Sequence, residues 1–295
     1  MAKIRKRRFS RLKHELDDLI RGVCGGFLFG VPLLYTMEVW WIGSSASPFR
    51  LLLVLLVTLI VVYLLSRTEG FRKIQSANER EAIGDTVEAV AIGLVCALLM
   101  LIILRQITLE TRLSEALGKV IFESVPFSLG VALANQLLSD ADSDDSASDN
   151  PPERSERFFP EGNLNETTAD VGATLIGAMI VAFSIAPTDE VTVLVSAVTG
   201  PWLMLTAIAS LLISYGIVFQ ANFSRQGQRR LQTGLFQSPL SETLFSYLVS
   251  LLAAALMLSF FRRIDPSAPW DLAFRQVLVL GLPATIGGAA GRLAL

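Results

Sequence analysis

Long apolar runs recur along this chain of 295 residues, and they decide what it can fold into. Each run is about 18 to 25 residues long, enough for a helix to cross roughly 30 Å of hydrocarbon. Lipid offers no hydrogen-bond partner to an open backbone, so the runs must be helical. We therefore predict an all-α, polytopic membrane protein whose roughly eight transmembrane helices cover residues 21–42, 48–66, 84–105, 114–137, 170–187, 201–220, 242–262 and 273–294.

The composition agrees with a membrane protein and argues against catalytic chemistry. Hydrophobic residues make up 52% of the chain, charged residues 18%, and the mean hydropathy is +0.53. The single histidine, His14, lies in a basic segment, while Cys24 and Cys96 lie in apolar runs, where a thiol behaves as a small hydrophobe. A Ser/His pair and a histidine metal site are both excluded from the predicted helices. We expect no enzyme, no cofactor and no metal site.

The distribution of Lys and Arg predicts the orientation of the helices. With the N-terminus inside, 18 of the 25 basic residues fall on the cytoplasmic side. This bias places both termini in the cytoplasm of a bacterial inner membrane. Residues 1–20 form a basic, amphipathic cytoplasmic segment suited to an anionic membrane surface. All four tryptophans then fall at the outer boundary: Trp40, Trp41, Trp202 and Trp270.

An internal repeat divides the chain almost in half. Residues 85–138 align with residues 242–295 without a gap, and 14 of the 54 pairs are identical. Between the halves, residues 139–169 are rich in Asp, Ser, Pro and Glu, which predicts a disordered, acidic cytoplasmic linker. The first repeat then covers residues 21–138 and the second residues 170–295. The identities include Arg105 with Arg262, Pro126 with Pro283, and Gly130 with Gly287.

The first helices of the two repeats align more loosely. GGFLFG from Gly25 resembles GATLIG from Gly172, and TMEV from Thr36 resembles TDEV from Thr188 after a five-residue insertion. Four crossings bring the chain back to the side on which it started. We therefore expect two parallel four-helix repeats related by a pseudo-two-fold axis along the membrane normal.

Ionisable residues inside a bilayer cost about 3 kcal/mol at its centre, so they are candidates for function. Glu123 lies near the middle of the fourth predicted helix, and Lys119 lies one turn before it. The two side chains can neutralise each other as an ion pair, or Glu123 can belong to an ion or proton pathway. Glu88 lies inside the third helix, where a carboxylate needs a partner or a proton.

Two further pairs of residues are candidates because of their positions. Glu38 and Glu190 lie near the outer ends of the first and fifth helices, where two acids would concentrate cations at a mouth. The alternative is a pair of solvated loop acids. Pro126 and Pro283 lie in register on the fourth and eighth helices and are expected to kink both alike. The two prolines therefore mark a candidate gate.

Residues 28–43, LFGVPLLYTMEVWWIG, and residues 182–191, AFSIAPTDEV, carry a family resemblance. The sequence resembles a bacterial family of integral membrane proteins that is defined only as a domain of unknown function. The resemblance covers nearly the whole chain and implies a membrane protein without implying an activity.

These observations predict a multi-pass membrane protein that passes an ion or small solute between two helical repeats. The alternative is a non-transporting scaffold or sensor whose basic head and acidic linker engage cytoplasmic partners. The lipid bilayer and an ion or solute are the expected partners. We expect no nucleic-acid partner, and the sequence is compatible with a homo-oligomer.

Overall fold

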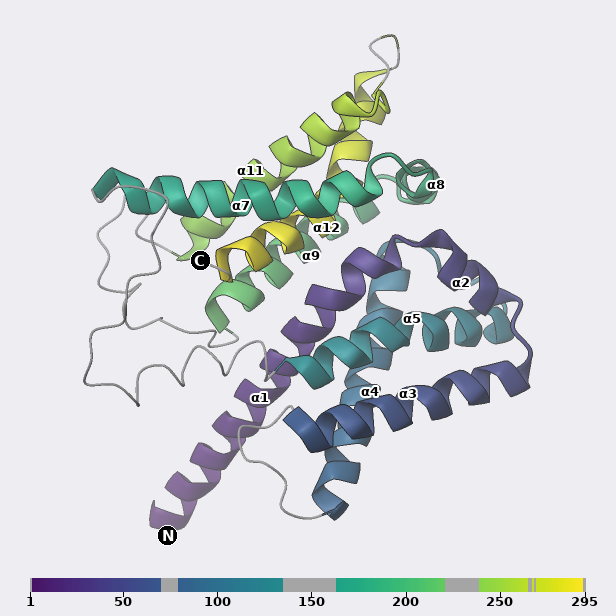
Figure 1. Ribbon diagram of the computed structural model, residues 1–295, viewed down its shortest axis with the longest axis vertical. Helices are drawn as coiled ribbons and strands as arrows, with labels where there is room; N and C mark the ends of the chain where they lie inside the picture. The colour runs from purple at the N-terminus through teal and green to yellow at the C-terminus, as the bar shows by residue number, and fades with distance from the viewer. Residues whose placement is uncertain are drawn as a thin grey trace. The chain divides into compact units, whose positions relative to one another are not determined.

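The computed structural model describes residues 2–69, 79–134, 163–220, 239–264, 267 and 269–293. Every regular element in these ranges is helical, which confirms the predicted all-α class (Figure 1). The helices form two compact units, one built from α1 to α5 and the other from α7 to α12. The predicted linker at residues 139–169 lies outside the described residues as far as residue 162, and residues 163–169 are helical.

Most predicted spans correspond to one helix each. Seven of the described helices are long and apolar enough to cross a membrane, and the bent pair of α1 and α2 would make an eighth. The first unit contains α1 (Ala2–Leu34), α2 (Met37–Ser44), α3 (Pro48–Glu69), α4 (Glu79–Ile103) and α5 (Leu113–Leu133). The second contains α7 (Asn163–Ile185), α8 (Glu190–Ala197), α9 (Pro201–Tyr215), the π-helix η1 (Gly216–Gln220), α11 (Pro239–Phe260) and α12 (Trp270–Leu293).

The predicted span over residues 21–42 is broken into two helices. Helix α1 ends at Leu34, and α2 leaves it at an angle of 87°. Pro32 lies in the last turn of α1 and has no backbone N–H to continue the hydrogen-bond ladder. The indole Nε1 of Trp40 donates to the carbonyl oxygen of Leu34 at 3.3 Å, which satisfies one of the acceptors freed by the break. Residues 2–20 of the basic segment are continuous with this helix.

A similar break separates α7 from α8 in the second unit. Helix α7 begins seven residues before the predicted span at residue 170, and the eight-residue helix α8 was not predicted. Arg263, which follows α11, holds the turn between them. Its Nη1 lies 2.7 Å from Asp189 Oδ1, and its Nη2 donates to the carbonyl oxygen of Pro187. A charged side chain from the segment after α11 therefore braces the turn at which α7 stops.

Glycines set the packing around α5 in the first unit. Helix α5 packs against α1, α2 and α3. A Cβ atom on Gly25 would lie 2.6 Å from the carbonyl oxygen of Gly130, and one on Gly43 would lie 2.7 Å from that of Gly118. Only glycine allows such close backbone approaches, as expected for small residues between membrane helices. Helix α5 is thus held near both of its ends.

Helix α12 has the corresponding place in the second unit, where it packs against α7, α8, α9 and α11. Gly177 of α7 lies against Gly287 of α12, and a Cβ atom on either residue would overlap the other backbone. The middle of α12 is buried on all sides, including the side chains of Leu280 and Leu282. This helix forms the core of its unit.

Helices α4 and α11 end in the same unusual way. Arg105 and Arg262 both have a φ of 55°, and among the described residues they alone adopt positive φ without being glycine. In the second unit, the N–H of Arg263 donates to the carbonyl oxygen of Leu258 at 2.8 Å, which is the six-to-one bond of a Schellman cap. Both arginines close their helices, as predicted, but they do so through the backbone.

Candidate functional site

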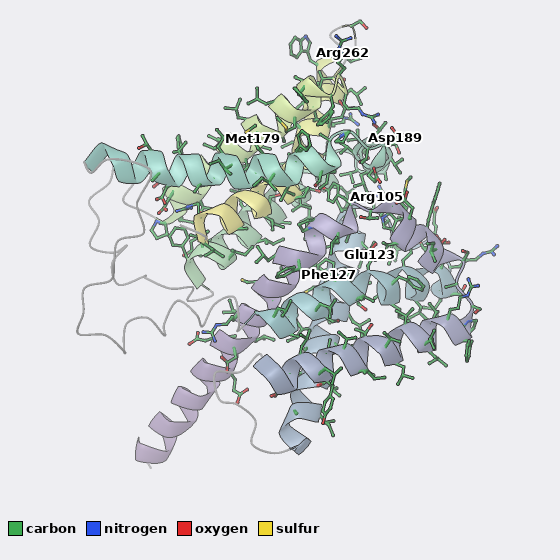
Figure 2. The ribbon with its side chains drawn as sticks, viewed as in Figure 1. Arg105, Glu123, Phe127, Met179, Asp189 and Arg262 are labelled. Atoms are coloured by element: carbon green, nitrogen blue, oxygen red, sulfur yellow. The ribbon has the colours of Figure 1, made fainter. Side chains whose placement is uncertain are left out.

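Glu123 is the most deeply buried acidic residue in the described part of the chain. It is 0% exposed, and neither of its carboxylate oxygens has a hydrogen-bond partner among the described residues. Figure 2 shows it on α5, close to Phe127. An ionised carboxylate at such a position would be uncompensated, which is very costly away from water. Glu123 therefore needs a proton, a cation or water.

The predicted ion pair between Lys119 and Glu123 is not formed. Lys119 Nζ lies 2.6 Å from Glu115 Oε1, one turn earlier on the same helix. An acid four residues before a lysine is the favoured order for a helical pair. The Glu115 side chain is 37% exposed, so its carboxylate keeps contact with solvent. The side chain of Glu123 is fully buried and has no such contact. Lys119 accordingly pairs with Glu115, whose ionised form is less destabilised by burial.

Glu123 faces the break between α1 and α2. Helices α1 and α5 run antiparallel, because Gly25 lies against Gly130 and Gly30 lies against the ring of Phe127. Phe127 lies one helical turn after Glu123 and shares its face of α5. Because the two helices are antiparallel, the position one turn before Phe127 on α5 lies level with the position one turn after Gly30 on α1, at Leu34. The buried carboxyl is therefore at the level where α1 stops.

Ser128 adds a second buried polar group on α5. Its Oγ atom has no hydrogen-bond partner within the described ranges, and it lies against Gly93 of α4, where a Cβ atom would overlap it. Ser124, in contrast, donates to the carbonyl oxygen of Ile121 at 2.8 Å. Buried polar atoms without partners are rare in native proteins, and each calls for a bound proton, water or ion as an explanation.

Glu38 and Glu190 do not form a matched pair. Glu38 is exposed in the first turn of α2, whereas Glu190 is 8% exposed at the start of α8. The Oε2 atom of Glu190 has no partner among the described residues. The two acids therefore differ in burial, and a shared role at a mouth stays a prediction.

The remaining predicted residues lie on separate helices. Glu88 is half-buried on α4. Pro126 and Pro283 lie inside α5 and α12, and both helices continue through them without a break. The large bends of this structure occur elsewhere, after Pro32 in the first unit and around Pro187 in the second.

A charged cluster in the second unit escaped the sequence analysis. Arg292 of α12 is buried and forms an ion pair with Glu242 of α11, and its Nη2 lies 3.9 Å from Asp170 Oδ2 of α7. Its Nη1 donates to Ser246 Oγ at 3.2 Å, and the ring of Phe219 in η1 lies 5.9 Å from the guanidinium carbon. The available signal was an acid in the first turn of α11, Glu242, and an arginine in the last turn of α12, Arg292.

No group of three His, Cys, Asp or Glu side chains in the described residues is placed to hold a metal ion. Comparison with known proteins bears on the class of the molecule. No curated protein and no solved structure matches the chain. One family model, described as "Putative integral membrane protein (DUF2391)", matches residues 18–295. Because this match spans nearly the whole chain, the protein is a member of the DUF2391 family of integral membrane proteins.

Proposed function

We propose that this protein passes an ion or small solute across the membrane along α5, with Glu123 as the intramembrane group that contacts it. The observation that carries the proposal is the complete burial of a carboxyl without a hydrogen-bond partner in the described residues. Such a group destabilises the fold unless something binds to it, so its presence is better explained by function than by packing.

The helix break beside Glu123 supports this proposal. Interrupted helices leave backbone groups free at the level of the membrane interior, and transporters use such ends at their binding sites. Helix α1 ends beside the face of α5 that carries Glu123, and the break is as sharp as 87°. A carboxyl and a broken helix at one level are the components of an intramembrane ion site.

We further propose that the two units are parallel repeats related by a pseudo-two-fold axis along the membrane normal. Both units have the same order of elements: a long helix, a short helix after a sharp turn, a helix that begins with Pro, and two more long helices. Arg105 and Arg262, which align in sequence, share the left-handed conformation. Under this topology both termini face the cytoplasm of a bacterial inner membrane.

Glycine contacts improve the alignment of the first helices. Gly130 and Gly287 align in the ungapped part of the repeat, and their partners are Gly25 and Gly177. Gly25 therefore corresponds to Gly177, not to Gly172. This pairing has the same offset as Thr36 with Thr188, so the five-residue insertion inferred from sequence is no longer needed.

The two units differ at the proposed site. The residue that aligns with Glu123 is Leu280, which is fully buried in α12. A duplicated apolar scaffold with one copy altered to carry an acid is the pattern expected if a single pathway developed in the first unit.

Reconstitution into liposomes tests the proposal. Vesicles with and without the protein are loaded with pH-sensitive or ion-sensitive dyes, and the flux of protons, Na⁺, K⁺ and chloride is compared under an applied membrane potential. We expect flux of at least one ion above that of empty vesicles and its loss in Glu123→Gln. If the folded protein passes none of these ions, the alternative of a non-transporting scaffold or sensor replaces transport. The mass of the purified protein in detergent will show whether it is a single chain or a homo-oligomer.

A further inference from the structure

We infer that the ion handled at Glu123 is a proton and that Lys119 exchanges between two acids as the proton leaves and returns. This inference rests on the proposed function and names the substrate class of the same site. Its basis is the juxtaposition, on one face of α5, of a buried free carboxyl and a lysine held one turn away.

Metal cations are a poor match to this site. A Na⁺, K⁺ or divalent ion must replace its hydration shell with several oxygen atoms. Glu123 supplies two oxygens from one carboxyl, and no described group forms a hydrogen bond with either. Phe127, one turn further on the same face, offers only an aromatic ring, which stacks edge-to-face on Phe27 with centroids 6.1 Å apart. A proton needs a single oxygen, and it removes the charge whose burial is costly.

The other titratable groups near α5 do not take over this role. None of them forms a hydrogen bond or an ion pair with Glu123 in the described structure. Glu38 and Arg50 are exposed on α2 and α3, and Glu88 is half-buried on α4. The remaining described titratable side chains on the elements packed against α5 are Glu15, Asp17, Asp18, Arg21 and Cys24 on α1, Tyr35 directly after α1, Tyr63 on α3, and Asp85 and Cys96 on α4.

Lys119 provides the countercharge that an ionised Glu123 would need. It lies four residues after Glu115 and four residues before Glu123, and side chains at both spacings are neighbours on a helix. When Glu123 holds the proton, Lys119 pairs with Glu115, as in this structure. When the proton leaves, the Lys119 side chain swings away from Glu115, and its ammonium group pairs with the new carboxylate of Glu123. Glu115 then keeps its negative charge without the lysine, because its side chain is 37% exposed.

The charges balance in this exchange. Release of the proton converts the Glu123 carboxyl to a carboxylate, while Lys119 and Glu115 keep their charges throughout. Only the partner of the lysine changes. The movement is a rotation of side-chain torsions, so α5 does not have to move for the proton to pass.

Infrared spectroscopy tests proton binding without depending on transport. The carbonyl stretch of a protonated carboxyl is recorded in reconstituted membranes at neutral pH. We expect a band that is present in the wild type, absent in Glu123→Gln and retained in Glu38→Gln, which makes the same change at an exposed acid of the same unit. A wild-type spectrum from Glu123→Gln would overturn the inference, because Glu123 would then hold no proton.

Flux measurements separate this inference from the proposed function. We expect potential-driven proton flux in wild-type vesicles and at least a tenfold loss in Glu123→Gln. We expect no loss in Glu110→Gln, which makes the same change at an exposed acid between α4 and α5. If the wild type passes Na⁺ or K⁺ but not protons, the proton inference is overturned while the transport proposal stands. If nothing passes, transport fails, and the infrared band alone decides whether Glu123 binds a proton.

Lys119→Met tests the exchange of partners. Without the lysine, the carboxylate would have no countercharge, so we expect at least a tenfold loss of proton flux while the infrared band of Glu123 remains. Wild-type flux in this variant would overturn the role of Lys119. Thermal unfolding in detergent establishes that each variant is folded, and methionine preserves the length of the lysine stem.

Discussion

The guanidinium of Arg292 on α12 is paired with the carboxylate of Glu242 on α11. The arginine side chain is only 1% exposed, and Asp170 of α7 approaches it at 3.9 Å. Three helices of the second unit therefore meet at one buried positive charge. Glu242 lies in the first turn of α11 and Arg292 in the last turn of α12, so their ion pair joins the ends of these two helices.

Replacing Arg292 with Ala should destabilise the second unit strongly. Glu242 and Asp170 would lose their shared countercharge, and removing one member of a buried ion pair costs about 3 kcal/mol or more. Arg275→Ala is the matched control on the same helix, because Arg275 pairs with Asp271 at 3.3 Å and both side chains are more exposed. That change should cost less than about 1 kcal/mol. Equal unfolding midpoints of the two variants in detergent would contradict the prediction.

Two glycines of α7 should respond to alanine in opposite directions. A Cβ atom on Gly177 would overlap the backbone of Gly287, so Gly177→Ala should push α12 away and cost about 1–3 kcal/mol. Nothing lies within 4 Å of a Cβ atom on Gly172. Gly172→Ala should stabilise the helix by about 0.5–1 kcal/mol, because alanine restricts the unfolded chain. Thermal unfolding of both variants measures the difference, and a destabilising Gly172→Ala would show that this side of α7 is covered.

Exchanging the aligned residues Glu123 and Leu280 should separate stability from function. Glu123→Leu removes a buried carboxyl without a hydrogen-bond partner in the described residues, and it should stabilise the protein by about 1–3 kcal/mol while abolishing flux. Leu280→Glu places the same group in the fully buried core of α12, where we expect a loss of about 3 kcal/mol or more. If Glu123→Leu lowers the unfolding midpoint, the carboxyl contributes to the fold, and the argument that it is retained for function fails.

Two adjacent tryptophans should differ in their effect on the first helix break. Trp40 is buried and donates to the carbonyl oxygen of Leu34, whereas Trp41 is 60% exposed. Trp40→Phe removes the donor and leaves a buried acceptor, which should cost about 1–3 kcal/mol. Trp41→Phe should change the stability by less than about 0.5 kcal/mol. The fluorescence emission maximum of Trp40 should also lie at a shorter wavelength than that of Trp41. Single-tryptophan variants can check this difference.

The sequence identified the buried acid Glu123 but not which groups form ion pairs around it. Glu123 stood out because a carboxyl inside an apolar run is unusual, and the structure buries it completely. The sequence left open whether Glu123 pairs with Lys119, because Lys119 has an acid on either side along the helix and spacing alone cannot rank them. The ranking follows from solvent exposure, which differs between Glu115 and Glu123 only once α1 and α2 have packed against α5.

The sequence by itself determined the helical class of the protein and where α3 and α9 begin. These features depend on hydrophobicity and on proline, which act along the chain and can be read locally. Only the tertiary structure decided where α1 and α7 stop and which charges meet. The reason is that Arg263 and Arg292 bind groups on segments far away in the sequence, which no local pattern contains. A hydrogen bond or ion pair between helices depends on their approach, and that approach is set by the glycine contacts of α5 and α12.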